Sequence, residues 1–283
     1  MNSRQQERFR DKYGPWAVVT GASSGIGRET AVRLAAAGLN LLLVARSKAA
    51  LDPLAAEVMA KHGIKAWVLP LDLAADSAGG ELASATTNME VGLLVAAAGF
   101  GTSGPFLDTP DDAEFDMLAV NCRAVFALTR LFGRRFAARG RGGIILFGSV
   151  VGFQGTPHAA HYAATKAYVQ SLGEALSVEL APLGVDVLVS APGPTHSGFA
   201  ARAGMTMGAA LTPAAVARAT LAALGHRQTV LPGLLSKLLG YALATAPRWL
   251  RVRIIGGVMK GMAKRPTPAA VPASIAPPPE GVR

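Results

Sequence analysis

Short apolar runs alternate along the chain with longer windows in which apolar residues recur at helical spacing. The short runs are rich in Val, Leu and Ile and predict β-strands over 16–20, 40–45, 65–71, 92–96, 143–148, 185–190 and 229–231. The longer, Ala-rich windows predict helices over 26–37, 48–62, 75–88, 111–139, 159–183 and 213–224. Because strands that alternate with crossover helices pair in parallel, the pattern predicts an α/β fold: a doubly wound, seven-stranded parallel sheet of Rossmann type, flanked by helices.

Turn chemistry and composition support this division of the chain. Gly38 follows the first helical window, and Thr212 stands before Pro213 as an N-cap residue stands before a proline in the first turn. Four segments are expected: a polar extension (1–13), the catalytic domain (14–232), a basic apolar helical extension (233–265) and a disordered Pro/Ala-rich tail (266–283). Within the extension, helices are predicted over 234–245 and 248–262.

Composition excludes some classes of protein. Of the 283 residues, 51% are hydrophobic and one is cysteine, Cys122, so an intramolecular disulfide is excluded. We expect Cys122 to be a small residue packed in a helix, and no His/Cys cluster has metal-ligand spacing. Residues 1–16 are polar and lack the apolar core of a signal peptide, so a cytoplasmic location is expected.

The net charge of +10 is unevenly distributed. Basic and acidic residues balance up to residue 186, whereas Glu280 is the sole acidic residue after it. The basic residues are not interleaved with aromatic residues and lie on no nucleic-acid reading motif, so nucleic-acid binding is not expected. A membrane surface or an acidic partner remains open for the last third of the chain.

A glycine-rich loop joins the first predicted strand to the first predicted helix. It reads Thr-Gly-Ala-Ser-Ser-Gly-Ile-Gly from Thr20 to Gly27. Glycines allow the backbone to approach a pyrophosphate, and a helix N-terminus offers free N–H groups and a positive dipole end to it. Turns also select glycine, so the loop by itself indicates a dinucleotide site only weakly.

The loop resembles the TGxxxGxG pattern of the short-chain dehydrogenase/reductase family. The resemblance extends over residues 14–232 through landmarks in the family's order: Asp72, Ala98-Gly99, Asn121, Ser149, Tyr162, Lys166 and Pro192-Gly193. It implies a Rossmann-type oxidoreductase that uses NAD(P) and assembles as a homodimer or homotetramer. By this resemblance, the cofactor contacts are Gly21, Ser23, Ser24, Gly25, Ile26, Gly27, Arg46, Asp72, Leu73, Ala98, Gly99, Asn121, Tyr162, Lys166, Pro192, Gly193 and Thr195.

The second strand indicates which cofactor is used. Ala45 stands where an acidic residue would pair with a ribose 2′-hydroxyl, and the adjacent Arg46 can hold a 2′-phosphate, so NADP is preferred over NAD. The alternative is that Arg46 is a solvated charge at the start of a helix. Asp72 and the Leu73 backbone border the adenine by resemblance, although Asp72 could equally be the N-cap of the next helix.

The predicted catalytic group is Ser149, Tyr162, Lys166 and Asn121. Tyr162 and Lys166 stand at i and i+4 on one helix face, where a cation favours the phenolate and brings the phenol toward its working range. By resemblance, Ser149 orients the substrate oxygen, Lys166 holds the nicotinamide ribose, and the Asn121 carbonyl positions a water. Without the glycine loop, the Tyr/Lys pair would indicate an ordinary half-buried helix face, and Asn121 could simply satisfy its neighbours.

One segment departs from the family's sequence pattern, and two histidines could suggest a different acid–base residue. Ala96 and Ala97 stand where the family usually has asparagine, which predicts a weakened hydrogen bond at the strand end. His158 and His161 flank the start of the catalytic helix, but Tyr162 already fills the acid–base role. Both histidines are therefore expected at the pocket rim or on the surface.

The loops that should form the substrate pocket, 100–106, 150–160 and 198–211, are apolar and free of acids, with Arg202 as their strong cation. They favour a hydrophobic ketone, aldehyde or alcohol. One alternative is an NADP-binding regulatory or scaffold protein without turnover, against which Ser149, Tyr162 and Lys166 argue. A sugar-nucleotide epimerase would need a longer substrate domain. The basic extension could be a lid, a subunit interface or a peripheral membrane contact.

Overall fold

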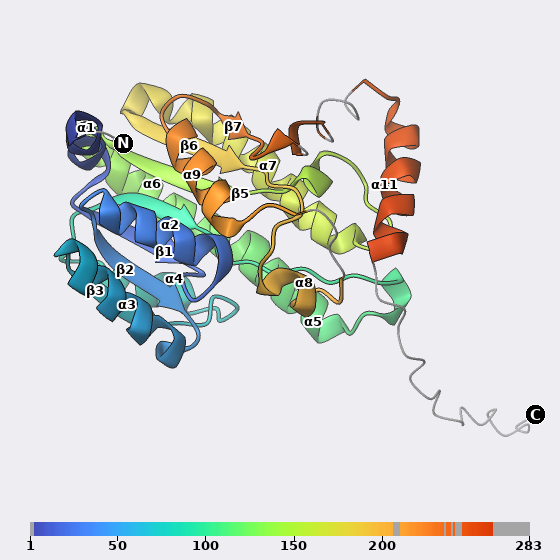
Figure 1. Cartoon of the computed structure of the whole chain (residues 1–283), viewed down its shortest axis with the longest axis horizontal. Helices are drawn as coiled ribbons and strands as arrows, with labels where there is room; N and C mark the ends of the chain where they lie inside the picture. The colour runs from blue at the N-terminus through green and yellow to red at the C-terminus, as the bar shows by residue number, and fades with distance from the viewer. Residues whose placement is uncertain (1–2, 206–209, 235, 239, 241–244, 263–283) are drawn as a thin grey trace, which may run out of the picture.

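The computed structural model describes the chain except for residues 1–2, 206–209, 235, 239, 241–244 and 263–283. Seven parallel strands form one sheet in the order β3-β2-β1-β4-β5-β6-β7, which confirms the predicted fold class (Figure 1). The strands are β1 Trp16–Thr20, β2 Asn40–Ala45, β3 Ala66–Pro70, β4 Val91–Ala96, β5 Gly142–Phe147, β6 Val185–Ser190 and β7 Thr229–Val230. The strand order reverses between β1 and β4, and sheets of this kind bind ligands at the carboxyl ends of the strands beside that point.

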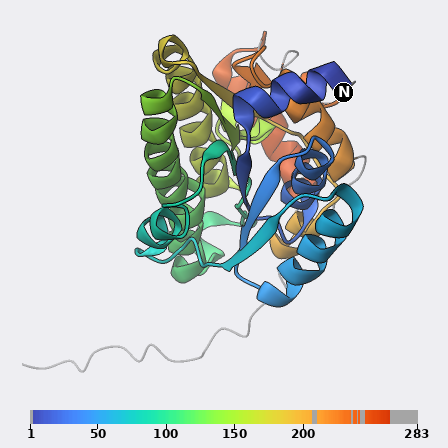
Figure 2. The same cartoon turned by 90° about the vertical axis from the view of Figure 1, so that its left-hand side faces the viewer.

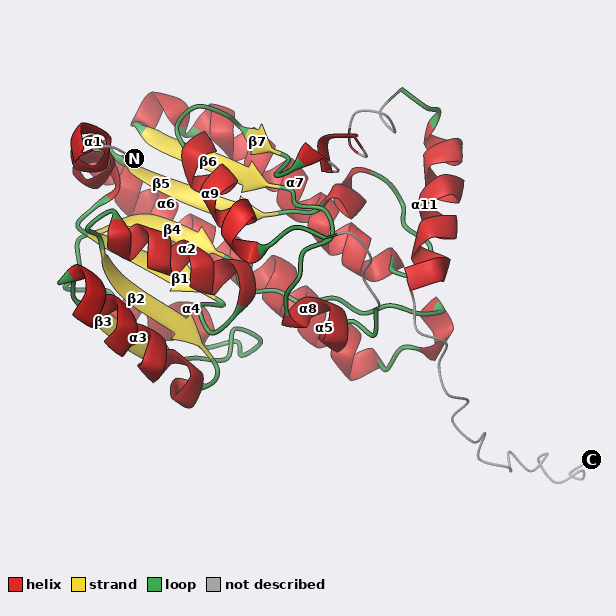
Figure 3. Cartoon of the chain, viewed as in Figure 1, coloured by secondary structure: helices red, strands yellow, loops and turns green. Residues whose placement is uncertain are grey.

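Helices cover both faces of the sheet, as Figures 2 and 3 show. One face carries α2 Gly25–Ala36, α3 Lys48–His62 and α9 Pro213–Ala223, and the other carries α4 Ala78–Ala85, α6 Val125–Arg139 and α7 Ala160–Glu179. Successive strand residues point to opposite faces, so neighbouring apolar residues serve two cores. Val19 of β1 packs in the first core and Val18 in the second.

The polar N-terminal extension is a helix, α1 Ser3–Tyr13, which the hydrophobic pattern did not predict. Tyr13 is buried, and its hydroxyl donates a 2.5 Å hydrogen bond to Asp186 Oδ2 at the start of β6. A Cβ at Gly143 would lie 2.9 Å from the Tyr13 ring, so glycine in β5 makes room for this ring. The sequence of α1 is mainly polar and therefore gave no hydrophobic signal for a helix. Contacts of Tyr13 with residues far along the chain stabilise it.

Two predicted helices differ from the observed ones. The window 111–139 is divided into α5 Asp111–Leu118, the π-helical turn η2 Ala119–Ala124 and α6. The window 75–88 shortens to α4, which follows the N-cap residue Ser77 and ends before Thr86. The Thr86 hydroxyl donates a 2.7 Å hydrogen bond to the Leu82 carbonyl at that end of the helix. Short 3₁₀ turns occur at η1 Phe106–Asp108, η3 Val150–Phe153 and η4 Ala181–Leu183.

The predicted turn residues and the helix predicted over 248–262 are confirmed. Gly38 has a φ of +84°, and the Thr212 side chain caps α9 by accepting a 3.2 Å hydrogen bond from the Ala215 N–H. Helix α11 Arg248–Met262 matches its predicted window and lies beyond the carboxyl ends of the strands (Figure 1). In the window 234–245, residues 234, 236–238 and 240 are helical, and residue 245 is a turn. Residues 235, 239, 241–244 and the predicted disordered tail lie outside the described residues.

Candidate active site

A cavity of about 480 Å³ opens at the carboxyl ends of the strands, and the glycine loop forms one wall of it. Gly21 has a φ of +65°, and a Cβ there would lie 2.8 Å from the Ala98 backbone. A Cβ at Gly27 would lie 2.3 Å from the Gly21 carbonyl oxygen. Side chains larger than hydrogen are therefore excluded at both positions, and the loop presents its backbone to the cavity.

The same loop suits an anionic pyrophosphate. It leads into α2, and the N-cap residue Ser24 makes no side-chain hydrogen bond to the first turn of that helix. The N–H groups of a first helical turn have no intrahelical partners and carry the positive end of the dipole. Because this turn borders the cavity, its residues fit the phosphates of a dinucleotide.

The expected cofactor-selecting residues lie at the rim of this part of the cavity. Arg46 is exposed, and the described residues offer it no ion pair, whereas Ser47 caps α3 by accepting a hydrogen bond from Ala50 N–H. Asp72 also lines the cavity, and its Oδ1 accepts a 3.0 Å hydrogen bond from Ala74 N–H. The alternative that Asp72 caps the next helix is wrong, because α4 begins later with Ser77 in that position.

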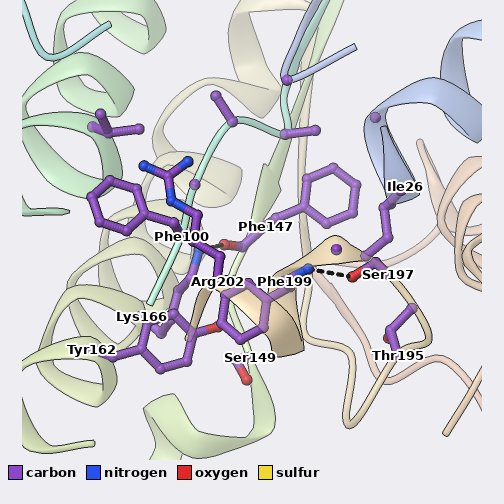
Figure 4. Close-up of a pocket in the computed structure, with 18 of the residues that line it drawn as sticks. Ile26, Phe100, Phe147, Ser149, Tyr162, Lys166, Thr195, Ser197, Phe199 and Arg202 are labelled. Carbon is purple, nitrogen blue, oxygen red and sulfur yellow. Dashed lines mark hydrogen bonds between the residues drawn. The ribbon is translucent and has the colours of Figure 1, made fainter. Parts of the chain in front are cut away.

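Tyr162, Ser149 and Lys166 come together in the cavity, although Ser149 is the N-cap residue of η3 and the other two lie on α7 (Figure 4). The Ser149 hydroxyl donates to the Pro192 carbonyl at 3.4 Å and accepts from Val151 N–H at 3.4 Å. Lys166 Nζ donates a 2.9 Å hydrogen bond to the Phe147 carbonyl and lies 5.7 Å from the centroid of the Tyr162 ring. This arrangement brings a proton donor, a hydroxyl and an amine to one apolar surface.

Burial is the largest cause of the pKa shifts of Tyr162 and Lys166. It raises the pKa of the Tyr162 phenol well above its usual range, while a hydrogen bond with Ser149 opposes the shift. Burial also lowers the pKa of Lys166 to about 8, and the nearby Cys122 thiol opposes that shift. Desolvation therefore outweighs the lowering of the phenol pKa that the i,i+4 spacing to Lys166 predicted.

Asn121 lies behind the cavity wall and does not line the cavity. Its Oδ1 accepts from Phe100 N–H at 3.2 Å, and its Nδ2 donates to the Phe100 carbonyl at 2.8 Å and to Thr165 Oγ1 at 3.0 Å. The side chain thus holds the strand-end loop against α7, which is the structural alternative raised for it. It sits in the π-helical turn η2, and turns of this type are frequent at functional sites.

Thr20 makes hydrogen bonds at the end of β4, where the replacement of asparagine by alanine predicted a weakened one. Its hydroxyl oxygen accepts from Ala98 N–H at 3.1 Å and donates to the Val95 carbonyl at 3.5 Å. The loop after β4 is therefore anchored although Ala96 and Ala97 replace the usual asparagines. Gly99 faces Asn121, since a Cβ there would lie 3.0 Å from Asn121 Oδ1.

The loop after β6 closes the cavity on another side. Ser236 Oγ accepts a 2.9 Å hydrogen bond from Gly193 N–H. Thr195 is buried, and its hydroxyl donates to the Gly193 carbonyl at 3.1 Å. Ser197 Oγ accepts from Phe199 N–H at 3.3 Å at the start of α8 Gly198–Arg202 (Figure 4).

Helix α11 supplies the wall of the cavity next to Tyr162, and a lid was one of the three alternatives that the sequence left open for this extension. Ile255 and Met259 are buried in a cluster with Phe100 and Tyr162, and they line the cavity with Val258. The spacing of Ile255 and Met259, one helical turn apart, was the signal for a buried face.

The three predicted pocket loops all contribute to the walls, with Phe100, Val150, Val151, Phe199 and Met205 among their lining residues. These loops contain no acidic residue, but Asp116 of α5 adds a carboxylate to the cavity lining. The Arg202 guanidinium lies 4.0 Å from the Phe100 ring centroid. Burial and the neighbouring Arg46 lower the pKa of Arg202, which Asp116 and Asp72 partly offset.

All predicted cofactor and catalytic residues except Asn121 line this one cavity. The histidines do not belong to it: His161 Nδ1 lies 2.6 Å from Glu114 Oε2, and the His158 carbonyl accepts from Gly104 N–H. Cys122 is buried in η2, in agreement with the packing role expected for it. No cluster of three or more metal-ligating side chains occurs within the described part of the chain.

The profile of the family described as short chain dehydrogenase matches residues 15–207. The chain belongs to this family. This short-chain dehydrogenase is 40% identical over 181 residues to a very-long-chain 3-oxoacyl-CoA reductase of Podospora anserina, covering 62% of this chain and 53% of that protein. It is 36% identical over 188 residues to a 7beta-hydroxysteroid dehydrogenase of Clostridium sardiniense, covering 66% of this chain and 72% of that protein. The chain spans about half the length of the first of these relatives.

Solved structures extend the similarity to most of the chain. A 7beta-hydroxysteroid dehydrogenase structure superposes with a TM-score of 0.80 at 27% identity, covering 88% of this chain and 99% of that one. A short-chain dehydrogenase from Sphingobium yanoikuyae in complex with NADPH gives a TM-score of 0.76 at 30% identity, covering 91% and 99%. A bulky-bulky ketone specific alcohol dehydrogenase from Comamonas testosteroni gives 0.71 at 30% identity, covering 91% and 98%.

Proposed function

We propose that this short-chain dehydrogenase uses NADP to interconvert bulky hydrophobic ketones, or aldehydes, and their alcohols. The observation that carries the proposal is that Ser149, Tyr162 and Lys166 share one cavity with the glycine cradle on one side and apolar walls on the other. A dinucleotide in the cradle and an apolar carbonyl compound against the walls would meet at Tyr162. The intact trio argues against a regulatory or scaffold protein that has lost turnover.

The roles of the residues follow from their positions. When bound, the reduced nicotinamide supplies a hydride to the carbonyl carbon. Ser149 is placed to donate a hydrogen bond to the carbonyl oxygen, and the Tyr162 phenol to give that oxygen its proton. Lys166 lies beside the phenol, and its charged form favours the phenolate left after proton transfer. Oxidation of an alcohol uses the same groups in reverse.

Preference for NADP rests on Arg46. Its exposed guanidinium at the end of β2 offers charge-assisted hydrogen bonds to a 2′-phosphate, and Ala45 leaves no carboxylate to repel that phosphate. The NADPH complex of the structurally similar Sphingobium yanoikuyae enzyme supports this choice. The phosphate would thus be held at the cavity rim, away from the catalytic trio.

Substrate class rests on the cavity walls. Phe100, Phe199, Met205, Ile255 and Met259 present large apolar surfaces next to Tyr162. The names of the similar proteins refer to 3-oxoacyl-CoA, hydroxysteroid and bulky ketone substrates, which share an extended apolar body around a carbonyl or hydroxyl group.

The test is NADPH oxidation, followed at its absorbance band, with a panel of soluble ketones of increasing apolar bulk. Turnover that rises from small dialkyl ketones to bulky cyclic or aryl ketones is the expected result. A protein that binds NADPH tightly but turns over no member of the panel in either direction would contradict the proposal and favour the regulatory alternative.

A further inference from the structure

The outer face of α11 combines exposed apolar side chains with basic ones. Trp249, Ile254 and Val258 are 61%, 45% and 48% exposed, although each is a large apolar residue on a regular helix. Arg253 stacks over the Trp249 ring at 5.5 Å, and Lys260 is exposed one helical turn beyond Gly256. The helix reads RWLRVRIIGGVMKGM and therefore contains no acidic residue.

One face of α11 is buried against the domain, and the other is exposed. Ile255 and Met259 are buried in the cluster that includes Phe100 and Tyr162, so the inner face is already occupied by the protein. A Cβ at Gly256 would lie 2.9 Å from the Pro157 ring, which shows how closely the helix rests on the loop after η3. The exposed apolar residues therefore are not needed for the packing of α11 on the domain.

The cavity reaches this outer face. Val258 lines the cavity and is also 48% exposed, so it stands at the mouth. The preceding segment adds two more exposed leucines, Leu234 and Leu238, with Lys237 between them. Apolar surface thus continues from the inside of the cavity to the outside of the molecule.

We propose that the outer face of α11 rests on an anionic lipid surface, so that the cavity mouth at Val258 faces the acyl region from which a lipophilic substrate enters. The choice of occupant follows from charge: apolar residues flanked by cations, without acids on the same helix, suit anionic headgroups above acyl chains. Supply of the substrate from the bilayer rests on the proposed function, whereas lipid binding does not. No helix among the described residues is long and apolar enough to span a bilayer.

The surface is limited in extent. The first turn of α5 carries Asp111, Asp112 and Glu114, so the basic character does not continue onto that helix. We therefore place the contact on α11 and on Leu234, Lys237 and Leu238. Charge reversal on α11 can remove the contact without altering the catalytic group.

The experiment is sedimentation of the full chain, without substrate, with vesicles of equal parts phosphatidylcholine and phosphatidylglycerol. We expect binding that weakens as salt is raised and that is absent with pure phosphatidylcholine. The double variant Arg253→Glu/Lys260→Glu should lower the partition coefficient at least about ten-fold. The matched control Lys61→Glu/Lys65→Glu, on exposed residues at the opposite end of the sheet, should bind as the wild type does.

A second variant separates insertion from charge attraction. Ile254→Asn retains every cation and should also weaken vesicle binding, because its apolar side chain is placed to enter the acyl boundary. Turnover of a soluble ketone without vesicles should be unchanged in all these variants. If the wild type itself turns over no ketone, that result contradicts the proposed function and leaves the lipid-binding proposal standing. Failure of the intact protein to sediment at low ionic strength would overturn the membrane proposal. So would equal losses in the α11 and control variants, or a dimer that the α11 variants dissociate.

Discussion

Lys166 Nζ donates a 2.9 Å hydrogen bond to the carbonyl oxygen of Phe147, the last residue of β5. This bond ties helix α7 to the end of the central sheet. It also holds an amine among buried groups, since Lys166 and Tyr162 are both buried. Burial affects the two groups in opposite directions, lowering the pKa of Lys166 and raising that of Tyr162.

The lowered pKa of Lys166 predicts how stability depends on pH. The folded protein has a Lys166 pKa of about 8, and a lysine in an unfolded chain titrates near 10.4. Between these values the unfolded chain binds more protons, so the free energy of unfolding rises with pH. Compared with Lys166→Met, the wild type should gain about 2 kcal/mol from pH 8 to pH 10, measured by denaturant unfolding without cofactor.

The raised pKa of Tyr162 limits this comparison at high pH, because its contribution to stability is complete below pH 10 and falls as pH rises further. Measurements should therefore stay between pH 8 and pH 10. Parallel stability profiles for the wild type and Lys166→Met over this interval would show that Lys166 keeps an ordinary pKa.

Removal of the Tyr162 hydroxyl should abolish most of the turnover. In Tyr162→Phe the ring still packs against Phe199, whose centroid is 5.3 Å away, so the cavity should keep its shape. We expect kcat to fall by about 10² to 10⁴-fold, with the dissociation constant for NADPH nearly unchanged. Single-turnover kinetics and fluorescence titration measure the two quantities. A variant that retains more than about a tenth of the wild-type rate would exclude Tyr162 as the proton donor.

Cofactor preference should move with the end of β2. The double variant Ala45→Asp/Arg46→Leu replaces a phosphate-binding guanidinium by a carboxylate suited to a ribose 2′-hydroxyl. The ratio of kcat/KM for NADPH to that for NADH should fall at least about ten-fold, since each lost charge-assisted hydrogen bond is worth about 1.5 to 3 kcal/mol. Lys48→Leu, on the same helix start but outside the cavity, is the control. Equal ratios in the double variant and the wild type would contradict the role of Arg46.

Asn121 should contribute to stability through the Phe100 backbone. Asn121→Ala removes three hydrogen bonds and leaves the buried Phe100 N–H and carbonyl without these partners. We expect a loss of about 3 kcal/mol in the free energy of unfolding. Asn88→Ala, at an exposed turn, should change it by less than about 0.5 kcal/mol. If the two variants unfold at the same denaturant concentration, the Asn121 bonds do not hold this loop.

Patterns among residues close together in the sequence predicted most of the secondary structure and the candidate site residues. Alternation of apolar runs and helical windows determines a parallel sheet, because side chains repeat every second residue in a strand and about every 3.6 residues in a helix. The spacing of Gly21 and Gly27 indicates a turn whose backbone can approach a ligand. The i,i+4 spacing places Tyr162 and Lys166 on one helix face. These properties depend on neighbours in sequence, so the sequence contains them directly.

Contacts between distant segments decided the rest. Helix α1 is held by Tyr13 against Asp186, and the Ile255 side of α11 becomes a cavity wall when it meets Phe100. The pKa of Tyr162 depends on how completely the surrounding segments remove water from it. Such burial arises when elements far apart in the chain pack together, and no local spacing records it. The sequence by itself therefore determined the strands, most of the helices and the residues proposed for catalysis, whereas the tertiary structure decided which surfaces enclose them and which remain exposed.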